Sequence, residues 1–139
     1  MNNGKYVLLV EDNQDDVTLT KIAFKKAQIQ NRLEVVWDGA EAMEYLFGKG
    51  RYANRDRSDK PAVILLDLKL PLVGGVQVLE AIYADINYGG VPVVVLTSSM
   101  EASDQRACNQ FGVTEYLQKP NSLSKFMEIL NDIKAKWLD

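Results

Sequence analysis

The sequence predicts a doubly wound α/β fold, in which helices cover both faces of a parallel β-sheet. Five short apolar runs alternate with five longer stretches whose apolar residues recur at helical spacing. The apolar runs are mostly unbroken, which is typical of strands that are buried on both faces. This alternation accounts for the whole chain of 139 residues, so we expect a single domain over residues 1–139.

The first half of the chain supplies two strands and two helices. Residues 6–10 are a continuous apolar run and are predicted to form a buried strand, and residues 14–28 carry an apolar face at helical spacing. Residues 33–37 are predicted to form a second strand that ends at an Asp-Gly pair. Residues 40–48 are predicted to form a helix that stops at Gly48, because glycine readily ends a helix.

The second half repeats the strand–helix pattern three times. Glycines 89 and 90 close the first of its helices, and Gly112 follows the second. The last helix carries an apolar stripe that we expect to face the core. The predicted strands and helices alternate in the order 62–66, 75–86, 92–96, 102–111, 114–118 and 122–137.

One irregular stretch, residues 48–60, is polar and locally basic. The simplest interpretation is a solvated connection between a helix and the third strand. The alternative is a docking loop for an acidic partner surface. Its basic residues are Lys49, Arg51, Arg55, Arg57 and Lys60.

Composition and charge exclude several classes of protein. Hydrophobic residues make up 47% of the chain and charged residues 25%, which excludes collagen-like and disordered proteins. Apolar runs of about five residues are far shorter than the ~20 that span a bilayer. With no signal-peptide pattern either, we expect a cytoplasmic protein without a membrane partner. A net charge of −3 argues against a nucleic-acid partner, and one cysteine with no histidine excludes disulfides and histidine-based catalysis.

Polar residues that could bind a ligand or take part in a reaction follow four of the predicted strands. Glu11 and Asp12 follow the first, Asp67 the third, Thr97 the fourth and Lys119 the fifth. Ligand sites of open α/β sheets lie beyond the carboxyl ends of the strands, so these side chains are expected in one cleft. Carboxylates so close together need a compensating cation, and an all-oxygen donor set favours Mg²⁺.

This arrangement suggests phosphoryl transfer to a carboxylate. Asp67 is the candidate nucleophile that would form an aspartyl phosphate. Mg²⁺ and Lys119 would neutralise the oxygens of the transferring group, and the Thr97 hydroxyl would donate to one of them.

Five motifs make the chain similar to the receiver domain of two-component response regulators. The resemblance covers residues 5–137, nearly the whole chain, and it implies a flavodoxin-like fold with a parallel sheet in the order 2-1-3-4-5. The motifs are VLLVEDN at 7–13, DGAEA at 38–42, ILLDLKLP at 64–71, VVVLTSS at 93–99 and YLQKP at 116–120.

The resemblance implies a role for each site residue. Asp67 is expected to be the phosphoacceptor. For the Mg²⁺ ion, Asp12 is expected to be a direct ligand, Glu11 to hold a metal-bound water, and Asp67 and the backbone carbonyl of Lys69 to complete the protein ligands. Self-phosphorylation from small phosphodonors and slow autodephosphorylation are expected, without further enzymatic activity.

The resemblance also implies how the phosphoryl group is sensed. Thr97 and Lys119 are expected to bind it, and Thr97 and Tyr116 are expected to act together as the switch. The Lys119–Pro120 peptide bond is expected to be cis, aiming the lysine into the site. One departure from the family is Lys69, whose ammonium we expect at the mouth of the site, where it would pair with the phosphoryl group and slow its hydrolysis.

A narrower resemblance rests on residues 52–54 and on the form of the acceptor segment. The chain is similar to stand-alone receivers that partner bacterial phytochrome-type histidine kinases. This implies such a kinase as phosphodonor, an unidentified downstream protein, and a homodimer through the face made by helix 102–111, strand 114–118 and helix 122–137.

Other functions fit the residues less well. A flavodoxin-type cofactor module needs a phosphate cradle where this chain has acids, a haloacid-type phosphatase needs an acid where Lys69 stands, and a P-loop nucleotidase needs a motif that the chain lacks. We therefore expect a response regulator that takes a phosphoryl group from a kinase histidine and signals by protein–protein contact. The alternative is a pseudo-receiver that binds proteins without being phosphorylated.

Overall fold

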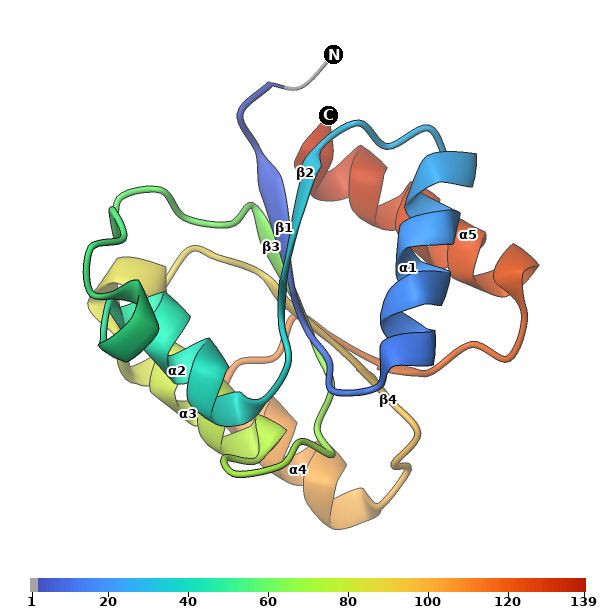
Figure 1. Ribbon diagram of the computed structural model, residues 1–139. Coiled ribbons are helices and arrows are strands. Elements are labelled where there is room, and N and C mark those ends of the chain that lie inside the picture. The colour runs from blue at the N-terminus through green and yellow to red at the C-terminus, as the bar shows by residue number, and fades with distance from the viewer. Residues whose placement is uncertain (1–2) are drawn as a thin grey trace.

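The computed structural model describes residues 3–139, which fold around a central parallel sheet with helices on both faces (Figure 1). Within the described residues the sheet has five strands in the order β2-β1-β3-β4-β5. The predicted α/β class and the strand order implied by the resemblance are both confirmed. The strands are β1 Tyr6–Val10, β2 Arg32–Val36, β3 Val63–Leu66, β4 Val93–Thr97 and β5 Glu115–Gln118.

Helices α1 and α5 cover one face of the sheet, and α2, α3 and α4 cover the other (Figure 1). This two-sided cover follows from the chain order, because parallel strands in one sheet need crossover helices that pack back onto it. The α-helices are α1 Gln14–Lys26, α2 Gly39–Phe47, α3 Gly75–Ala84, α4 Ala102–Gln110 and α5 Leu123–Ile133. Shorter helical turns lie at Gly50–Tyr52, Ile86–Tyr88 and Lys134–Leu138.

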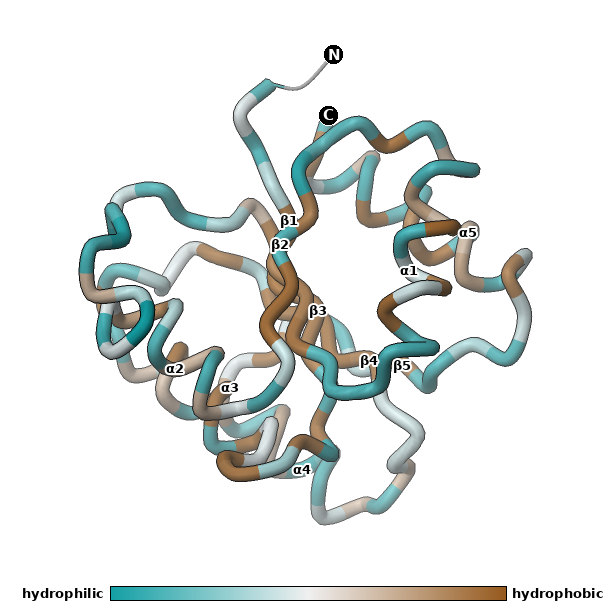
Figure 2. The backbone as a smooth tube through the Cα atoms, in the orientation of Figure 1, coloured by the Kyte–Doolittle hydropathy of each residue, from teal (hydrophilic) through white to brown (hydrophobic). Residues whose placement is uncertain are grey.

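Side chains of the central strands divide between two hydrophobic cores. Tyr6, Leu8 and Val10 of β1 point into the core beneath α2 and α3, whereas Val7 and Leu9 point into the core beneath α1 and α5. Every residue of β1 is buried, as the continuous apolar run predicted. Figure 2 shows the consequence: the strands at the centre consist mostly of hydrophobic residues, whereas hydrophobic and hydrophilic residues alternate along the helices around them.

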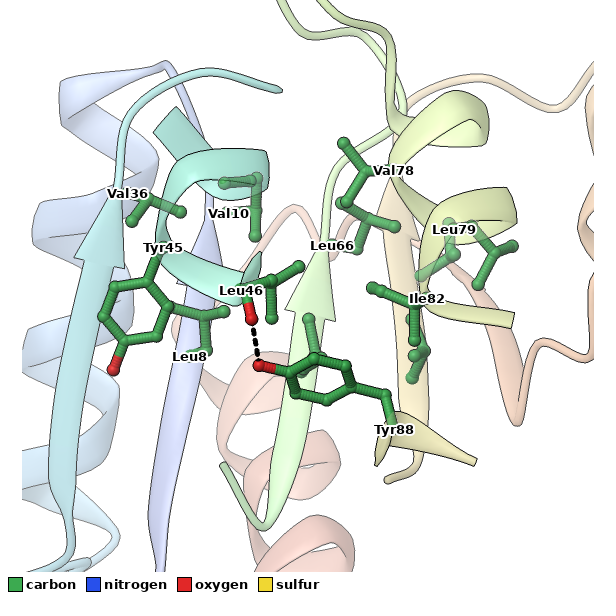
Figure 3. Packing of buried hydrophobic residues seen from close by; sticks show 14 of the residues in the cluster. Leu8, Val10, Val36, Tyr45, Leu46, Leu66, Val78, Leu79, Ile82 and Tyr88 are labelled. Atoms are coloured by element: carbon green, nitrogen blue, oxygen red, sulfur yellow. Dashed lines mark hydrogen bonds between the residues drawn. The ribbon is translucent and has the colours of Figure 1, made fainter. Parts of the chain in front are cut away.

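The core beneath α2 and α3 contains a buried tyrosine that is tied to a helix end. The Tyr88 hydroxyl donates a hydrogen bond to the backbone carbonyl of Leu46, in the last turn of α2 (Figure 3). The last carbonyls of a helix have no partner within the helix, so a donor from the core satisfies one of them. Tyr88 itself is 1% exposed.

Side chains that precede the helices cap three of them. Asn13 accepts from the amide of Asp16 at the start of α1, Asp38 from that of Glu41 in α2, and Ser122 from that of Lys125 in α5. Asp38 is the first residue of the DGAEA motif, so this part of the motif starts a helix. At the far end of α2, Gly48 adopts the left-handed conformation (φ 64°) that closes the helix.

The basic stretch 48–60 packs onto the molecule. Arg51 pairs with Glu44 of α2, the Arg55 guanidinium lies 4.0 Å from the centre of the Tyr45 ring, and Arg57 pairs with Asp85. The arginines are thus engaged within the chain, which disfavours the interpretation as a basic docking loop. Turn geometry and aromatic contacts of this kind leave no periodic signal in the sequence.

Two details differ from the sequence-based expectations. The helix expected over 75–86 ends at Ala84, because Asp85 accepts from the amide of Asn87 and starts a separate 3₁₀ turn. Among residues 3–139 no peptide bond is cis, so Lys119–Pro120 is trans and the expected cis bond is wrong. The trans form is the more stable one for most X–Pro bonds, and it still brings the lysine into the site.

Among the described residues, no helix has the length and apolar character needed to cross a bilayer.

Candidate functional site

The carboxylates expected in one cleft do lie together at the carboxyl end of the sheet. Glu11 and Asp12 follow β1, and Asp67 follows β3. The strand ladder continues into them, because the Asp67 amide donates to Val10 (3.1 Å) and the Glu11 amide donates to Val36 (3.1 Å). One carboxylate oxygen from each acid lies within 4.8 Å of the others.

Lys119 brings an ammonium group into the same cluster from the end of β5. Its Nζ lies 2.8 Å from Glu11 Oε1, 2.7 Å from Asp16 Oδ2 and 3.2 Å from Asp67 Oδ2. Its backbone amide donates to the carbonyl of Thr97 (2.9 Å), which anchors the lysine to the neighbouring strand. The side chain is 23% exposed, so these ion pairs are largely shielded from water.

Burial sets the electrostatics of the acidic cluster. Glu11 is 4% exposed and Asp67 is 5% exposed, whereas Asp12 is exposed. Burial, opposed by the hydrogen bond from Lys119 and reinforced by the charge of Asp67, raises the pKa of Glu11 to about 7. Burial lowers the pKa of Lys119, but its bonds to Asp16 and Glu11 outweigh this and leave that pKa above its ordinary value.

The donor set fits a hard divalent cation. Glu11, Asp12 and Asp67 offer oxygen ligands on one small volume, and the exposed Asp12 leaves a side open for water. Among the described residues, this cluster includes no cysteine or histidine, the ligands that would favour zinc. A cation held there would relieve the mutual repulsion of these carboxylates.

The two expected switch residues, Thr97 and Tyr116, are linked through Ser99. Thr97 is fully buried at the end of β4, and its hydroxyl oxygen accepts from the Ser99 amide (3.1 Å). The Tyr116 hydroxyl, from β5, donates to the Ser99 carbonyl (2.8 Å). The structure therefore connects Thr97 and Tyr116 through the backbone of one residue.

Lys69 approaches the cluster with its backbone and points its side chain elsewhere. Its amide donates to Asp67 Oδ1 (3.3 Å), which places the backbone of Lys69 next to the carboxylate. Its ammonium group lies 3.4 Å from Asp104 Oδ2 of α4. The ammonium that we expected at the mouth of the site therefore forms an ion pair with α4.

Sequence reasoning assigned no role to three residues that the structure brings into contact with the expected ones. Asp16 pairs with Lys119, and Ser99 and Asp104 connect Lys69 to Tyr116. Asp16 and Asp104 both lie in the first turn of a helix. Acids are common there because they stabilise the helix dipole, so their position alone gave no reason to single them out.

Comparison with known proteins agrees with the fold. The family model for the response regulator receiver domain matches residues 7–131. The response regulator Rcp1 from Synechocystis sp. is 36% identical over 138 residues, which covers 99% of this chain and 92% of that protein. The Mn²⁺-bound structure of Rcp1 superimposes with a TM-score of 0.84 over 97% of this chain and 95% of that one.

Two further solved structures are similar over nearly the whole chain. The phosphorylated cyanobacterial phytochrome response regulator RcpA is 38% identical, with a TM-score of 0.86 over 97% of this chain and 94% of that one. The bacteriophytochrome response regulator AtBRR is 41% identical, with a TM-score of 0.78 over 96% and 94%. Both resemblances predicted from the motifs are confirmed: this chain belongs to the response regulator receiver domain family, and phytochrome response regulators are among its relatives.

Proposed function

We propose that this chain is a stand-alone response regulator that takes a phosphoryl group onto Asp67 from the histidine of a sensor kinase, in a Mg²⁺-dependent reaction. Residues 1–139 then form a single receiver domain that signals through protein–protein contact. The observation that carries the proposal is the setting of Asp67, a nearly buried carboxylate that touches Lys119 and shares a cluster with Glu11 and Asp12.

The environment of Asp67 suits it to act as a nucleophile on phosphorus. One of its oxygens contacts the Lys119 ammonium and the other accepts from the Lys69 amide. One carboxylate oxygen attacks the phosphorus, the P–N bond to the kinase imidazole breaks, and the imidazole takes up a proton as it leaves. The product is an acyl phosphate on Asp67.

The neighbouring residues have separate tasks in this transfer. Lys119 neutralises charge on the phosphoryl oxygens, and the Thr97 hydroxyl donates to one of them. Asp12, Asp67, a water on Glu11 and the Lys69 carbonyl would hold Mg²⁺, which supplies further neutralisation of the transferring group. The chain acts as a signalling phosphoacceptor that slowly loses its phosphoryl group to water.

The change at Asp67 reaches the surface through the switch residues. Phosphorylation adds nearly two negative charges, toward which Thr97 turns its hydroxyl. The Thr97–Ser99–Tyr116 connection then rearranges and reshapes the α4–β5–α5 face, which is the proposed surface for a downstream protein and for a homodimer. Similarity to RcpA, Rcp1 and AtBRR supports a phytochrome-type kinase as the donor.

Intact-mass spectrometry after incubation with acetyl phosphate tests the proposal. We expect the wild-type chain to gain one phosphoryl group in the presence of Mg²⁺ and none in EDTA, and Asp67→Asn to gain none. Asp15→Asn, which changes an exposed acid of α1, is the matched control and should be phosphorylated like the wild type. If neither acetyl phosphate nor a phytochrome-type kinase labels the chain, and Mg²⁺ does not bind, the pseudo-receiver becomes the better description.

A further inference from the structure

A single carboxylate, that of Asp104, joins three segments near the site. Its Oδ2 accepts from the Ser99 hydroxyl at 2.6 Å and lies 3.4 Å from the Lys69 ammonium. Ser99 belongs to the loop after β4, Lys69 to the loop after β3, and Asp104 to the first turn of α4. The Asp104 side chain is 22% exposed and that of Lys69 is 57% exposed, so water competes more for the ion pair than for the hydrogen bond to Ser99.

Ser99 is the point at which this carboxylate meets the switch. Its amide donates to Thr97, its carbonyl accepts from Tyr116 and its hydroxyl donates to Asp104. These bonds fix the Ser99 backbone and side chain from three directions. A rearrangement that moves Thr97 and Tyr116 must therefore also move or break the bond to Asp104.

Helix α4 buries little of its surface near its start. Within its described residues, Ala102–Gln110, only Cys108 is buried. Glu101, which precedes the helix, makes no side-chain capping bond in the part of the chain that the structure describes. With so little apolar burial, the two polar contacts of Asp104 form a large share of what positions the start of α4.

Lys69 stands between two anions once Asp67 carries a phosphoryl group. Its amide already bonds to Asp67, and its ammonium pairs with Asp104. The phosphoryl group carries more charge than a single carboxylate and attracts the same ammonium. If the Lys69 ammonium paired with the phosphoryl group and with Asp104 at once, the two anions would lie close together and repel each other. The ammonium therefore favours one of them.

We propose that Asp104 is a positioning residue that stabilises the unphosphorylated arrangement, by holding the Ser99 loop and by keeping the Lys69 ammonium on α4. Phosphorylation at Asp67 competes for Lys69, releases Asp104 and frees the loop after β4 to follow Thr97. This inference rests on the proposed function, since it says how Asp104 affects the phosphorylated state of Asp67.

The lifetime of the phosphoryl group measures the competition for Lys69. After labelling with acetyl phosphate and removal of the donor, we expect Asp104→Asn to lengthen the half-life about threefold, the effect of freeing Lys69 from one exposed ion pair. Asp104→Glu should restore most of the wild-type half-life. Glu101→Gln removes an exposed negative charge three residues before Asp104 and should leave the half-life unchanged.

A double-mutant cycle separates this role from a merely structural one. In a Lys69→Met background, Asp104→Asn should change the half-life far less than it does in the wild type, because the ammonium for which the anions compete is absent. Equal effects of Asp104→Asn in both backgrounds, or no effect in either, would overturn the proposal.

Amide hydrogen exchange of the unphosphorylated chain provides a second measure that does not depend on phosphorylation. We expect Asp104→Asn to speed exchange in α4 and in the loop around Ser99, and to leave exchange in α3 at the wild-type rate. The Glu101→Gln variant should exchange at wild-type rates throughout. Unchanged exchange would contradict the proposed positioning role of Asp104 even if the phosphoryl lifetimes change. Failure of the wild type to take up a phosphoryl group refutes the proposed function, whereas normal uptake with unchanged lifetimes refutes the role of Asp104 alone.

Discussion

Gly75 begins α3 directly behind the loop that carries Asp67, and its backbone leaves no room for a side chain. A Cβ atom there would collide with the Asp67 carbonyl oxygen and lie 2.5 Å from Leu68 Cα. Both are backbone atoms that cannot turn aside. At the neighbouring Gly74, an added Cβ would lie 3.8 Å from the flexible end of the Gln77 side chain.

These two glycines form a matched pair for mutation. We expect Gly75→Ala to lower the free energy of unfolding by about 1–3 kcal/mol, because the backbone next to Asp67 must shift. Gly74→Ala should change it by no more than about 0.5 kcal/mol, since its φ of −70° suits alanine. Urea denaturation of both variants measures the difference. Equal stability of the two would show that the segment after Asp67 adapts without cost.

At the scale of elements, Tyr88 connects the turn after α3 to the end of α2. Its hydroxyl donates to the Leu46 carbonyl in the buried core between these helices (Figure 3). The phenol ring also packs edge-on against Phe47 at a centroid distance of 5.9 Å. A phenylalanine at this position would keep the ring and remove only the donor.

We expect Tyr88→Phe to lower the free energy of unfolding by about 1–2 kcal/mol, because the Leu46 carbonyl loses its partner in a buried setting. Phosphoryl uptake should be unaffected, since Tyr88 lies in a different part of the fold from the acidic cluster. Chemical denaturation and the acetyl phosphate assay test the two halves of this prediction. Tyr83→Phe, at a tyrosine that is 61% exposed, serves as the control and should be neutral.

At the scale of the whole molecule, the acidic cluster makes stability depend on pH and on Mg²⁺. The folded-state pKa of Glu11 is about 7, above its ordinary value of 4.5. A raised carboxyl pKa means that this group favours the fold most at pH below about 4.5 and loses that contribution as the pH rises through 7. A cation bound by the ionised cluster would restore the loss.

We therefore expect Mg²⁺ to bind about tenfold more weakly at pH 6 than at pH 8, because a proton on Glu11 must leave before the carboxylate can take part. Isothermal titration calorimetry at the two pH values, in buffers of different ionisation enthalpy, measures both the affinity and the proton released. Glu11→Gln should remove most of the pH dependence, and Asp15→Asn should keep it. The same affinity at both pH values would contradict the raised pKa.

Much of this molecule could be predicted because the signals are local. The unbroken run at 6–10 marked a strand buried on both faces, and β1 has those bounds. Parallel strands end at one edge of their sheet, so Glu11, Asp12, Asp67 and Lys119 could be expected together from the sequence alone. Boundaries were less certain: the first helix ends at Lys26, and Gln28 takes a positive φ that patterns of hydrophobicity do not signal.

By itself, then, the sequence determined the fold class, the order of elements and the residues at the carboxyl edge, because periodicity and strand ends depend on neighbours in the chain. Tertiary structure decided which charges pair. Lys119 meets Asp16 across 103 residues, and Lys69 meets Asp104 across 35. Such pairs depend on how separate helices pack against the sheet, which sets the direction of each side chain. The packing of the basic stretch 48–60 onto α2 was decided in the same way.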